Sequence, residues 1–229
     1  MASEHAVIIE ESLRIPTEAL TFEGFRHWAH SGEFPDTGRI DYLAGDVEVD
    51  MSPEDLHTHG IVKVAITVGL DALVTARELG EVFSDSTRIT SPVAELSAEP
   101  DVVVVLWESL QAGRVRYLPA AGKKPDRFTE IEGAPDVVVE VVSDSSVRKD
   151  TKRLPPLYAQ AGVPELWIVD TRGRDMRFDL KLLQDGEYVS RGPDAGGWLR
   201  SERLGALVRL SRRKTPISTW GYRLEHREG

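Results

Sequence analysis

The most informative hydrophobic pattern lies in residues 134–170 and predicts the order strand, helix, strand. Apart from Glu140, Val137–Val142 is a β-branched run, too short for a helix and apolar at consecutive positions. Such a run is typical of a central strand that is covered on both faces. A polar turn and then a helix are expected next, and Gly162 is a typical residue for ending that helix. The apolar residues 166–169 predict a second buried strand.

The rest of the chain predicts further elements of both kinds, with helices where apolar residues recur every three or four positions and strands where they alternate or run together. The predicted helices are a short one that buries Phe22, Phe25 and Trp28, and a long one over about 59–79 that buries Ile61, Val64, Ala65, Val68, Leu73 and Val74. The predicted strands are a hairpin over 39–51 with its turn at 44–46, single strands over 81–90 and 102–106, and a hairpin of 174–183 with 187–189 around Asp185-Gly186. Residues 108–133 and 190–198 are expected to be loops.

Length and composition indicate a single globular domain. The chain has 229 residues, of which 41% are hydrophobic, and we place the core at about 39–190 with 1–16 and 191–229 as peripheral extensions. The absence of cysteine excludes disulfides and thiolate metal sites and is compatible with a reducing compartment, so we expect a cytoplasmic protein. Because no run of eighteen apolar residues is present, no membrane association is expected. The net charge of −10 argues mildly against tight non-specific binding to nucleic acid.

Two carboxylates stand out because each belongs to a strand that should be buried. Glu140 interrupts the valine run, and Asp101 opens the apolar strand 102–106. A buried ionised carboxylate is costly unless it is paired or holds a metal. If the two strands are neighbours, a divalent cation between the carboxylates would relieve their repulsion, and Mg²⁺ suits one or two carboxylates plus waters. The spacing alone leaves open that both residues are structural caps.

Several motifs, taken in order, resemble one nuclease superfamily. They are Glu-Pro-Asp ending at Asp101, Pro-Asp-Val-Val-Val-Glu-Val-Val-Ser containing Glu140, the Lys-Asp pair ending at Asp150, and Leu-Tyr-Ala-Gln-Ala-Gly-Val-Pro-Glu-Leu-Trp-Ile-Val-Asp at 157–170. Together they resemble the PD-(D/E)XK nuclease superfamily, in the branch named "putative restriction endonuclease" (the Uma-two type). The pattern around Asp41 and His59 also resembles that branch.

The resemblance implies an α/β (α+β) fold of the restriction-endonuclease type. We expect a central mixed β-sheet flanked by helices, with an N-terminal helix and hairpin and a C-terminal hairpin extension. It also implies a Mg²⁺ (or Mn²⁺) site in which Asp101 and Glu140 are catalytic and ligate the ion. The residues expected around these ligands are Asp41, Glu48, His59 and Asp150.

The catalytic lysine of the superfamily departs from its usual place. Two residues past Glu140 stands Val142, and Leu154 occupies the position where this branch commonly supplies a lysine. Lys152 and Arg153 precede it, and we expect one of them to take the lysine's role. On an ideal helix, however, Lys152 points about 200° away from position 154.

A third acidic residue, Asp136, is also a Pro-Asp aspartate. It lies four residues before Glu140, which at about 3.3 Å per residue is some 13 Å, too far to share one ion. We therefore choose Asp101 as the partner of Glu140 and interpret Asp136 as a strand-start residue. The basic residues of the 108–133 segment either belong to a solvated linker or form a rim that faces phosphate: Arg114, Arg116, Lys123, Lys124 and Arg127.

Three functions follow from these patterns. The favoured one is a metal-dependent endonuclease that hydrolyses DNA phosphodiester bonds by metal-activated water. The second is a catalytically inactive nuclease-like module that binds nucleic acid or protein, and the third is a hydrolase of small phosphate esters. DNA is the expected partner, and a homodimer would explain cutting of both strands.

Overall fold

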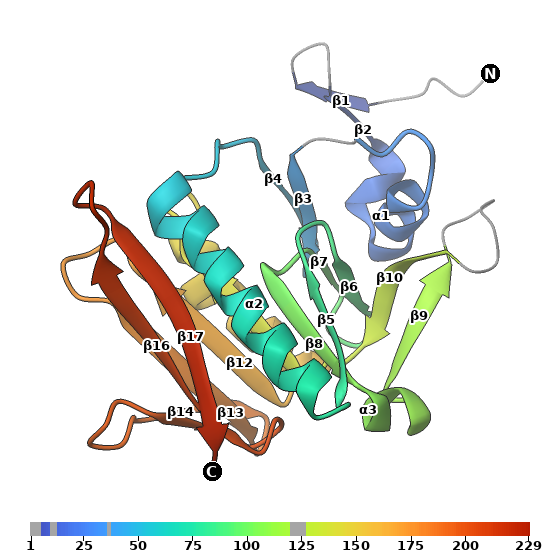
Figure 1. Cartoon of the computed structure of the whole chain (residues 1–229). Helices are drawn as coiled ribbons and strands as arrows, with labels where there is room; N and C mark the ends of the chain where they lie inside the picture. The colour runs from blue at the N-terminus through green and yellow to red at the C-terminus, as the bar shows by residue number, and fades with distance from the viewer. Residues whose placement is uncertain (1–5, 10–12, 36–37, 120–126) are drawn as a thin grey trace, which may run out of the picture.

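The central sheet is mixed and six-stranded, with strand order β14-β13-β12-β11-β8-β5 (Figure 1). The computed structural model describes residues 6–9, 13–35, 38–119 and 127–229. In this sheet β11 and β12 are parallel, and all other neighbouring strands are antiparallel. The strands are β5 (Gly80–Ser84), β8 (Val102–Leu106), β11 (Val137–Val141), β12 (Glu165–Asp170), β13 (Arg177–Gln184) and β14 (Glu187–Arg191).

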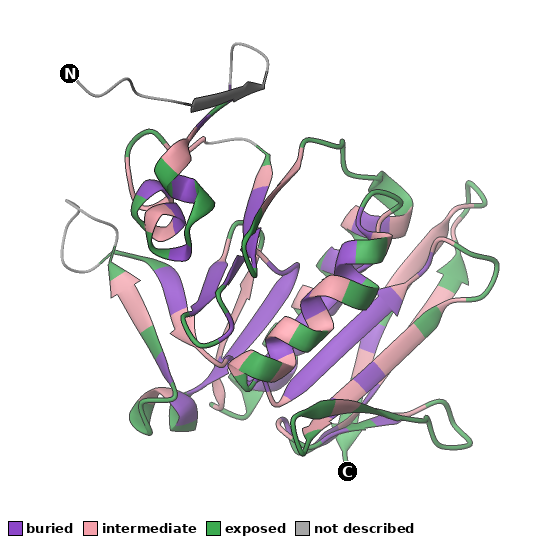
Figure 2. Ribbon diagram, turned by 180° about the vertical axis from the view of Figure 1, so that it is seen from behind, coloured by how far each residue is buried: buried purple, intermediate pink, exposed green. Residues whose placement is uncertain are grey.

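Both faces of the central strands are covered, as the valine runs predict. In β8, Val102 and Val104 pack into one hydrophobic cluster, whereas Val103 and Val105 pack into another. The valines of β11 divide between the same two clusters. Figure 2 shows these strands as buried along their length. A carboxylate on such a strand is therefore held inside the protein by the packing of its apolar neighbours.

One face of the central sheet is covered by the long helix α2 (Ile61–Ala76) and a three-stranded antiparallel sheet. The strands of that sheet are β15 (Leu199–Ser201), β16 (Ala206–Lys214) and β17 (Trp220–Glu228). Leu199, Val208 and Leu224 belong to the same hydrophobic cluster as α2 and the central strands, so this segment contributes to the core packing. The approach of β17 to α2 is so close at Gly69 that a Cβ there would lie 2.5 Å from Leu224 Cβ.

The buried face of α2 differs from the prediction. The helix buries Val62, Ile66 and Leu70 together with the predicted Leu73 and Val74. The apolar side chains of Ile61, Val64 and Val68 are instead exposed. A helix that is apolar nearly all round does not specify from its own pattern which face is buried.

The other face of the central sheet packs against the helix α4 (Leu154–Ala161) and a second six-stranded sheet. The strand order of that sheet is β4-β3-β7-β6-β10-β9, with β6 and β10 parallel. The strands are β3 (Arg39–Leu43), β4 (Asp46–Asp50), β6 (Arg88–Ser91), β7 (Leu96–Ala98), β9 (Val115–Pro119) and β10 (Phe128–Gly133).

The N-terminal part packs as a smaller unit on the second sheet. Phe22, Phe25 and Trp28 of α1 (Phe22–Ala29) are buried with Ile40 and Tyr42, which confirms the predicted aromatic stripe. The remaining short elements are β1 (Ala6–Ile9), which pairs with β2 (Leu13–Pro16), a 3₁₀ turn (Thr17–Leu20) and α3 (Trp107–Gln111).

Two predicted segments are wrong in the same way. The single strand expected over 81–90 is two strands, β5 and β6, which belong to different sheets. The loop expected over 108–133 contains α3, β9 and β10. Both segments bridge between sheets, and their place in those sheets depends on pairing with strands outside the segment, β5 with β8 and β10 with β6, which local composition does not reveal.

Two of the basic residues for which a solvated linker or a phosphate-facing rim was considered are paired with carboxylates. Arg114 contacts the buried Asp136, and Arg116 forms an ion pair with Glu132. Lys123 and Lys124 lie outside the described residues.

The segment Leu56–Ala76, which includes α2, is long and apolar enough to cross a membrane by length and composition. It does not form a continuous run of eighteen apolar residues, because charged residues interrupt it. In the fold its helix packs against β5 and β17 as a core helix.

Candidate active site

Asp101 and Glu140 lie side by side across two neighbouring strands. β8 and β11 pair antiparallel, with Val102 opposite Val139. Continuing that register by one residue places Asp101 opposite Glu140 at one end of the central sheet. The adjacency predicted from the valine runs is therefore present.

Glu140 is held in an environment that disfavours its charge. The side chain is buried, and Oε1 accepts a hydrogen bond from the Tyr158 hydroxyl at 2.5 Å. Oε2 is also buried and has no hydrogen-bond partner among the residues that the structure describes. Burial, and then the negative charges of Asp150 and Asp101, raise the pKa of Glu140 well above its usual value. A buried acceptor without a donor costs free energy in the absence of a ligand.

Asp101 is equally buried but is held as a carboxylate. Arg39 donates to Oδ1 at 2.9 Å, the backbone N–H of Val141 donates to Oδ2 at 2.7 Å, and His59 Nε2 lies 3.3 Å from Oδ2. Burial alone would raise its pKa, but the hydrogen bond from His59 and the charge of Arg39 outweigh burial and lower the pKa of Asp101. The two opposite carboxylates thus have pKa values shifted in opposite directions.

The turn before α4 supplies two more buried charges. Residues Lys149–Arg153 form a π-helical turn, in which Lys149 and Asp150 are buried. Lys149 Nζ donates to Asp41 Oδ2 at 3.0 Å. Burial, and the negative charge of Asp101, raise the pKa of Asp150 to about 7. Asp150 Oδ1 is buried without a hydrogen-bond partner in the described part of the chain, whereas Oδ2 accepts from Ser146.

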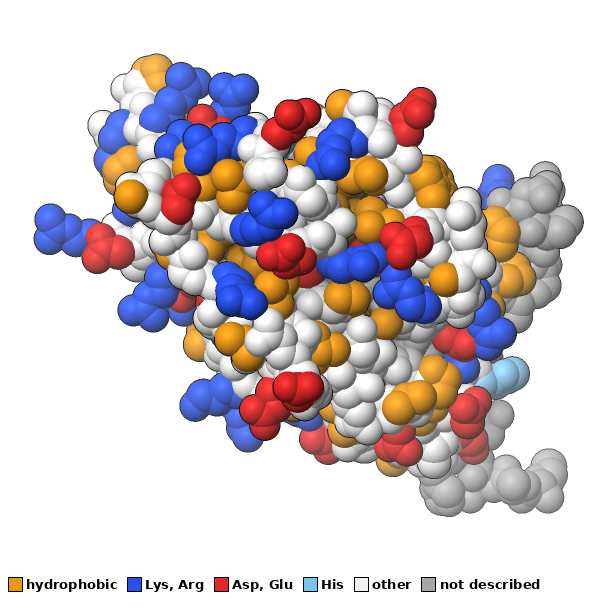
Figure 3. Space-filling view, turned by 90° about the horizontal axis from the view of Figure 1, so that it is seen from below, with side chains coloured by type: hydrophobic (Ala, Val, Ile, Leu, Met, Phe, Trp, Pro, Cys, Tyr) orange, Lys and Arg blue, Asp and Glu red, His pale blue; other side chains and the backbone are white. Residues whose placement is uncertain are grey.

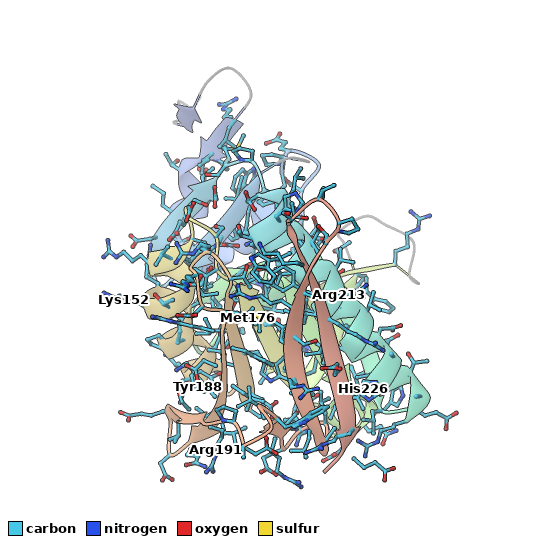
Figure 4. The ribbon with its side chains drawn as sticks, turned by 60° about the vertical axis from the view of Figure 1, so that its left-hand side comes forward. Lys152, Met176, Tyr188, Arg191, Arg213 and His226 are labelled. Carbon is cyan, nitrogen blue, oxygen red and sulfur yellow. The ribbon has the colours of Figure 1, made fainter. Side chains whose placement is uncertain are left out.

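Lys152 and Arg153, the basic residues predicted for the site, point elsewhere. The Lys152 side chain is exposed and forms no ion pair within the described residues (Figure 4). Arg153 is bound to the β3–β4 hairpin, where it forms ion pairs with Asp46 and Glu48. Glu48, expected near the metal ligands, is therefore held by Arg153.

In place of Lys152 and Arg153, the π turn before α4 brings Lys149 among the buried carboxylates. The charges of Asp41, Glu140 and Asp150 favour its protonated form, so that its pKa is raised even though burial acts to lower it. Counting residues on an ideal helix from position 154 missed Lys149 because the chain here forms a π turn, which changes the direction of each side chain. The sequence did contain a signal for Lys149, because the Lys149-Asp150 pair is one of the motifs that resemble the nuclease superfamily.

His59 links Asp101 to the surface. It lies in a second π-helical turn, Leu56–Gly60, directly before α2. Its Nδ1 lies 2.7 Å from Glu54 Oε1, and Lys63 Nζ lies 2.7 Å from the same oxygen. Although burial lowers the pKa of His59, the hydrogen bond to Asp101 raises it above its usual value overall. His59 therefore presents one nitrogen to the candidate metal ligand and the other to a partly exposed carboxylate.

A cavity of about 360 Å³ opens beside these residues, and Arg39, Glu54, His59, Lys63 and Glu99 contribute to its wall. It is predominantly polar in its lining residues, so that it suits a charged or hydrated ligand better than an apolar one.

Asp136 lies at the opposite end of β8 and β11 from Asp101 and Glu140, where its carboxylate is bound by neighbouring residues. Its carboxylate accepts from the backbone N–H of Leu106 at 2.8 Å and from the Ser109 hydroxyl, and it pairs with Arg203. All of these partners are protein groups, which agrees with the interpretation of Asp136 as a structural residue.

The described residues contain no cluster of three or more His, Cys, Asp or Glu side chains with the geometry to hold a metal ion. Mg²⁺ needs only one or two protein carboxylates, because water supplies its remaining ligands. The partnerless oxygens of Glu140 and Asp150 are the kind of hard ligand that this ion prefers. The donors present thus fit a hydrated divalent cation bound by few carboxylates.

Comparison with known proteins places this arrangement in context. The family model described as "Uma2: Putative restriction endonuclease" matches residues 22–211. A solved structure of "a putative nuclease belonging to DUF820 from Anabaena variabilis" is similar with a TM-score of 0.58 and 14% identity, covering 80% of this chain and 90% of that chain. At this identity the likeness shows the fold, and it confirms the predicted nuclease-like α/β architecture. No curated protein sequence matches the chain.

Proposed function

Because the chain belongs to the family described as "Uma2: Putative restriction endonuclease", we propose that it is a metal-dependent endonuclease that hydrolyses DNA phosphodiester bonds. The observation that carries the proposal is the buried Oε2 of Glu140, which has no partner within the described ranges and lies directly across the strand pair from Asp101. Such an oxygen is costly to maintain unless a ligand uses it.

Asp101 and Glu140 would hold a magnesium or manganese ion, with Asp150 nearby. When bound, the ion would activate a water molecule and neutralise charge that develops on the phosphate. The raised pKa of Glu140 and the fixed carboxylate of Asp101 mean that binding would require Glu140 to lose its proton.

The chain's own cations provide the rest of the electrostatics. Lys149 is held by Asp41 and is surrounded by carboxylates, so its ammonium group is fixed in position before any substrate arrives. A preorganised positive charge in a buried site stabilises negative charge on a phosphate better than a flexible surface lysine does. Arg39 fixes the orientation of Asp101, and His59 holds the second oxygen of that carboxylate.

The alternative function is a catalytically inactive nuclease-like module that binds nucleic acid or protein. The charge of the cavity wall favours it, since four carboxylates, Asp50, Glu54, Asp85 and Glu99, outnumber the cations Arg39 and Lys63 in that wall. This excess of negative charge would repel a phosphate chain if no cation were bound. A third function, hydrolysis of small phosphate esters, fits the limited cavity volume of about 360 Å³.

A cleavage assay separates these functions. Wild-type protein, Glu140→Ala and the control Glu108→Ala, which removes an exposed carboxylate, are incubated with supercoiled plasmid, single-stranded DNA and nucleotides in Mg²⁺, Mn²⁺ or chelator. We expect nicking that needs the ion, falls at least about 10²-fold in Glu140→Ala and is unchanged in Glu108→Ala. DNA left uncut under every ion would overturn the proposal, and activity on nucleotides alone would favour the third function.

The proposal includes a homodimer as the form that cuts both strands and a cytoplasmic location. Sedimentation with and without a short duplex tests the first, and fractionation of cells tests the second. A monomer that nicks only one strand would contradict the dimer without affecting the site.

A further inference from the structure

Two tryptophans, Trp198 directly before β15 and Trp220 at the start of β17, each have two cations close to the ring. Arg209 and Arg227 lie 4.5 and 4.3 Å from the centre of the Trp198 ring. Both arginines are also paired with carboxylates, Arg209 with Glu225 at 3.0 Å and Arg227 with Asp194 at 3.4 Å. This first stack is therefore close to neutral.

The second stack lies at the tip of the β16–β17 hairpin and is not neutralised. Arg212 and Lys214 lie 4.3 and 4.0 Å from the centre of the Trp220 ring. Within the part of the chain that the structure describes, neither cation forms an ion pair, and the same holds for the exposed Arg213 between them. The tip is thus a local concentration of positive charge in a protein whose net charge is −10.

The strand geometry presents these cations on both faces of the hairpin. Arg212 and Lys214 share the face of Trp220, and Arg213 points to the other face because side chains alternate along a strand. The turn beyond them carries Ile217, which is 78% exposed. A two-stranded ribbon has the width to enter the major groove of DNA, where phosphates would flank both of its faces.

The tip lies at the same end of the molecule as the candidate active site. Arg212 donates to the backbone carbonyl of Arg174, in the loop that follows β12. In the same loop, Thr171 Oγ1 donates to the carbonyl of Thr58 at 2.9 Å, next to His59. Figure 1 shows the tip of β16–β17 beside the N-terminal end of α2, and Figure 4 shows Arg213 toward that tip and His226 farther along the hairpin. At the opposite end, seen in Figure 3, acidic and basic side chains are interspersed.

We propose that the tip of the β16–β17 hairpin is a DNA-contacting arm, in which Arg212, Arg213 and Lys214 bind backbone phosphates on either side of a groove. The inference rests on the proposed function for its choice of polyanion. It goes beyond the family likeness, because the family model ends at residue 211, just before these cations. The arm would contact DNA beyond the phosphate that is cut and would offset the repulsion from the acidic cavity wall.

The test compares two double variants that lower the net charge by the same amount. Arg213→Gln/Lys214→Gln removes cations from the tip, and Arg209→Gln/Arg227→Gln removes them from the neutralised stack. Both are made in the Glu140→Ala background, and binding to a labelled duplex is measured by fluorescence anisotropy in Ca²⁺ over a range of salt concentrations. Cleavage by the corresponding proteins with intact Glu140 is measured in parallel.

We expect the tip variant to bind about tenfold or more weakly near 0.1 M salt, with the slope of log K against log salt reduced by about 2. The control variant, Arg209→Gln/Arg227→Gln, should bind DNA within about twofold of its parent. A charge-preserving variant, Arg213→Lys/Lys214→Arg, should bind like the parent, which shows that charge and not folding is responsible.

Equal losses in the two double variants, or no DNA binding by the parent, would overturn the arm. So would a tip-dependent affinity for anionic phospholipid vesicles with none for DNA, an outcome that the exposed Ile217 makes worth measuring. If the tip variant selectively loses DNA binding but no protein cleaves, the arm stands and the proposed nuclease activity fails. If the protein cleaves DNA and the tip variant binds DNA normally, the nuclease activity stands and the proposed arm fails.

Discussion

Lys149 and Asp41 form a buried ion pair, 3.0 Å from Nζ to Oδ2, although they are 108 residues apart in the chain. Asp41 lies on β3 of the second sheet, and Lys149 lies in the π turn before α4. The other oxygen of the Asp41 carboxylate, Oδ1, accepts a hydrogen bond from the backbone N–H of Glu99 at 3.0 Å. Glu99 lies two residues before Asp101. The pair therefore fixes the basic group relative to the strand that carries a candidate metal ligand.

Replacing Lys149 tests whether it is the basic group of the site. In Lys149→Met we expect cleavage to fall about 10²-fold or more, because a preorganised positive charge near the phosphate is lost. Stability should also fall, by about 3–5 kcal/mol, because Asp41 is left buried and unpaired. Plasmid nicking and urea denaturation measure the two effects.

Two further variants separate those effects. Asp41→Asn/Lys149→Met should recover much of the stability but none of the cleavage, since the buried charge is gone and the cation is still absent. Lys152→Gln, which alters the exposed lysine, should leave both unchanged. If Lys149→Met cleaves normally and Lys152→Gln loses cleavage, Lys152 and not Lys149 is the basic group of the site, as expected from the sequence.

Glu140→Gln should lower activity but raise stability, whereas Lys149→Met should lower both. We expect loss of cleavage together with an increase in the free energy of unfolding of about 1–2 kcal/mol in chelator, because the amide carries no charge beside Asp101 and Asp150. Urea denaturation above neutral pH, with Glu108→Gln as the control, measures the change. A less stable Glu140→Gln protein would show that the carboxylate is needed for packing, and the metal-site assignment would lose its main support.

Asp136→Asn tests the choice between the two Pro-Asp aspartates. The carboxylate accepts from the N–H of Leu106 and the hydroxyl of Ser109 and pairs with Arg203, so its removal should cost about 2–4 kcal/mol of stability. Cleavage per folded molecule should be unchanged at low temperature. If the variant is stable but inactive, Asp136 and not Asp101 is the partner of Glu140.

Acidification should weaken a contact that lies away from the site. Glu130 is buried, and although burial acts to raise its pKa, hydrogen bonds from His30 and Arg26 lower it. A carboxyl whose pKa is lower in the folded state stabilises the fold above its unfolded pKa of about 4.3 and loses that contribution as pH falls through the folded value. Glu130→Gln should therefore be about 1–3 kcal/mol less stable at pH 7, and the difference should shrink toward pH 3 in urea denaturation. A difference independent of pH would contradict this sign.

The parts of the fold that were predictable are those whose signal is local. The valine runs of β8 and β11 specify strands covered on both faces, because β-branched residues at consecutive positions suit no other short element in a core. The Asp185-Gly186 turn specifies the β13–β14 hairpin, since both residues adopt positive φ there. The placement of Asp101 opposite Glu140 followed from the strands that carry them.

The basic residue of the site and the second sheet did not follow from the sequence, because both depend on contacts between distant segments. Lys149 is directed inward by a π turn, and its partner Asp41 lies on another sheet, so no count along an ideal helix finds it. β9 and β10 pair with each other, but what attaches them to the second sheet is the pairing of β10 with β6, and β5 joins the central sheet through β8. Local pattern thus determined where charge is buried, and long-range packing determined which cation meets it.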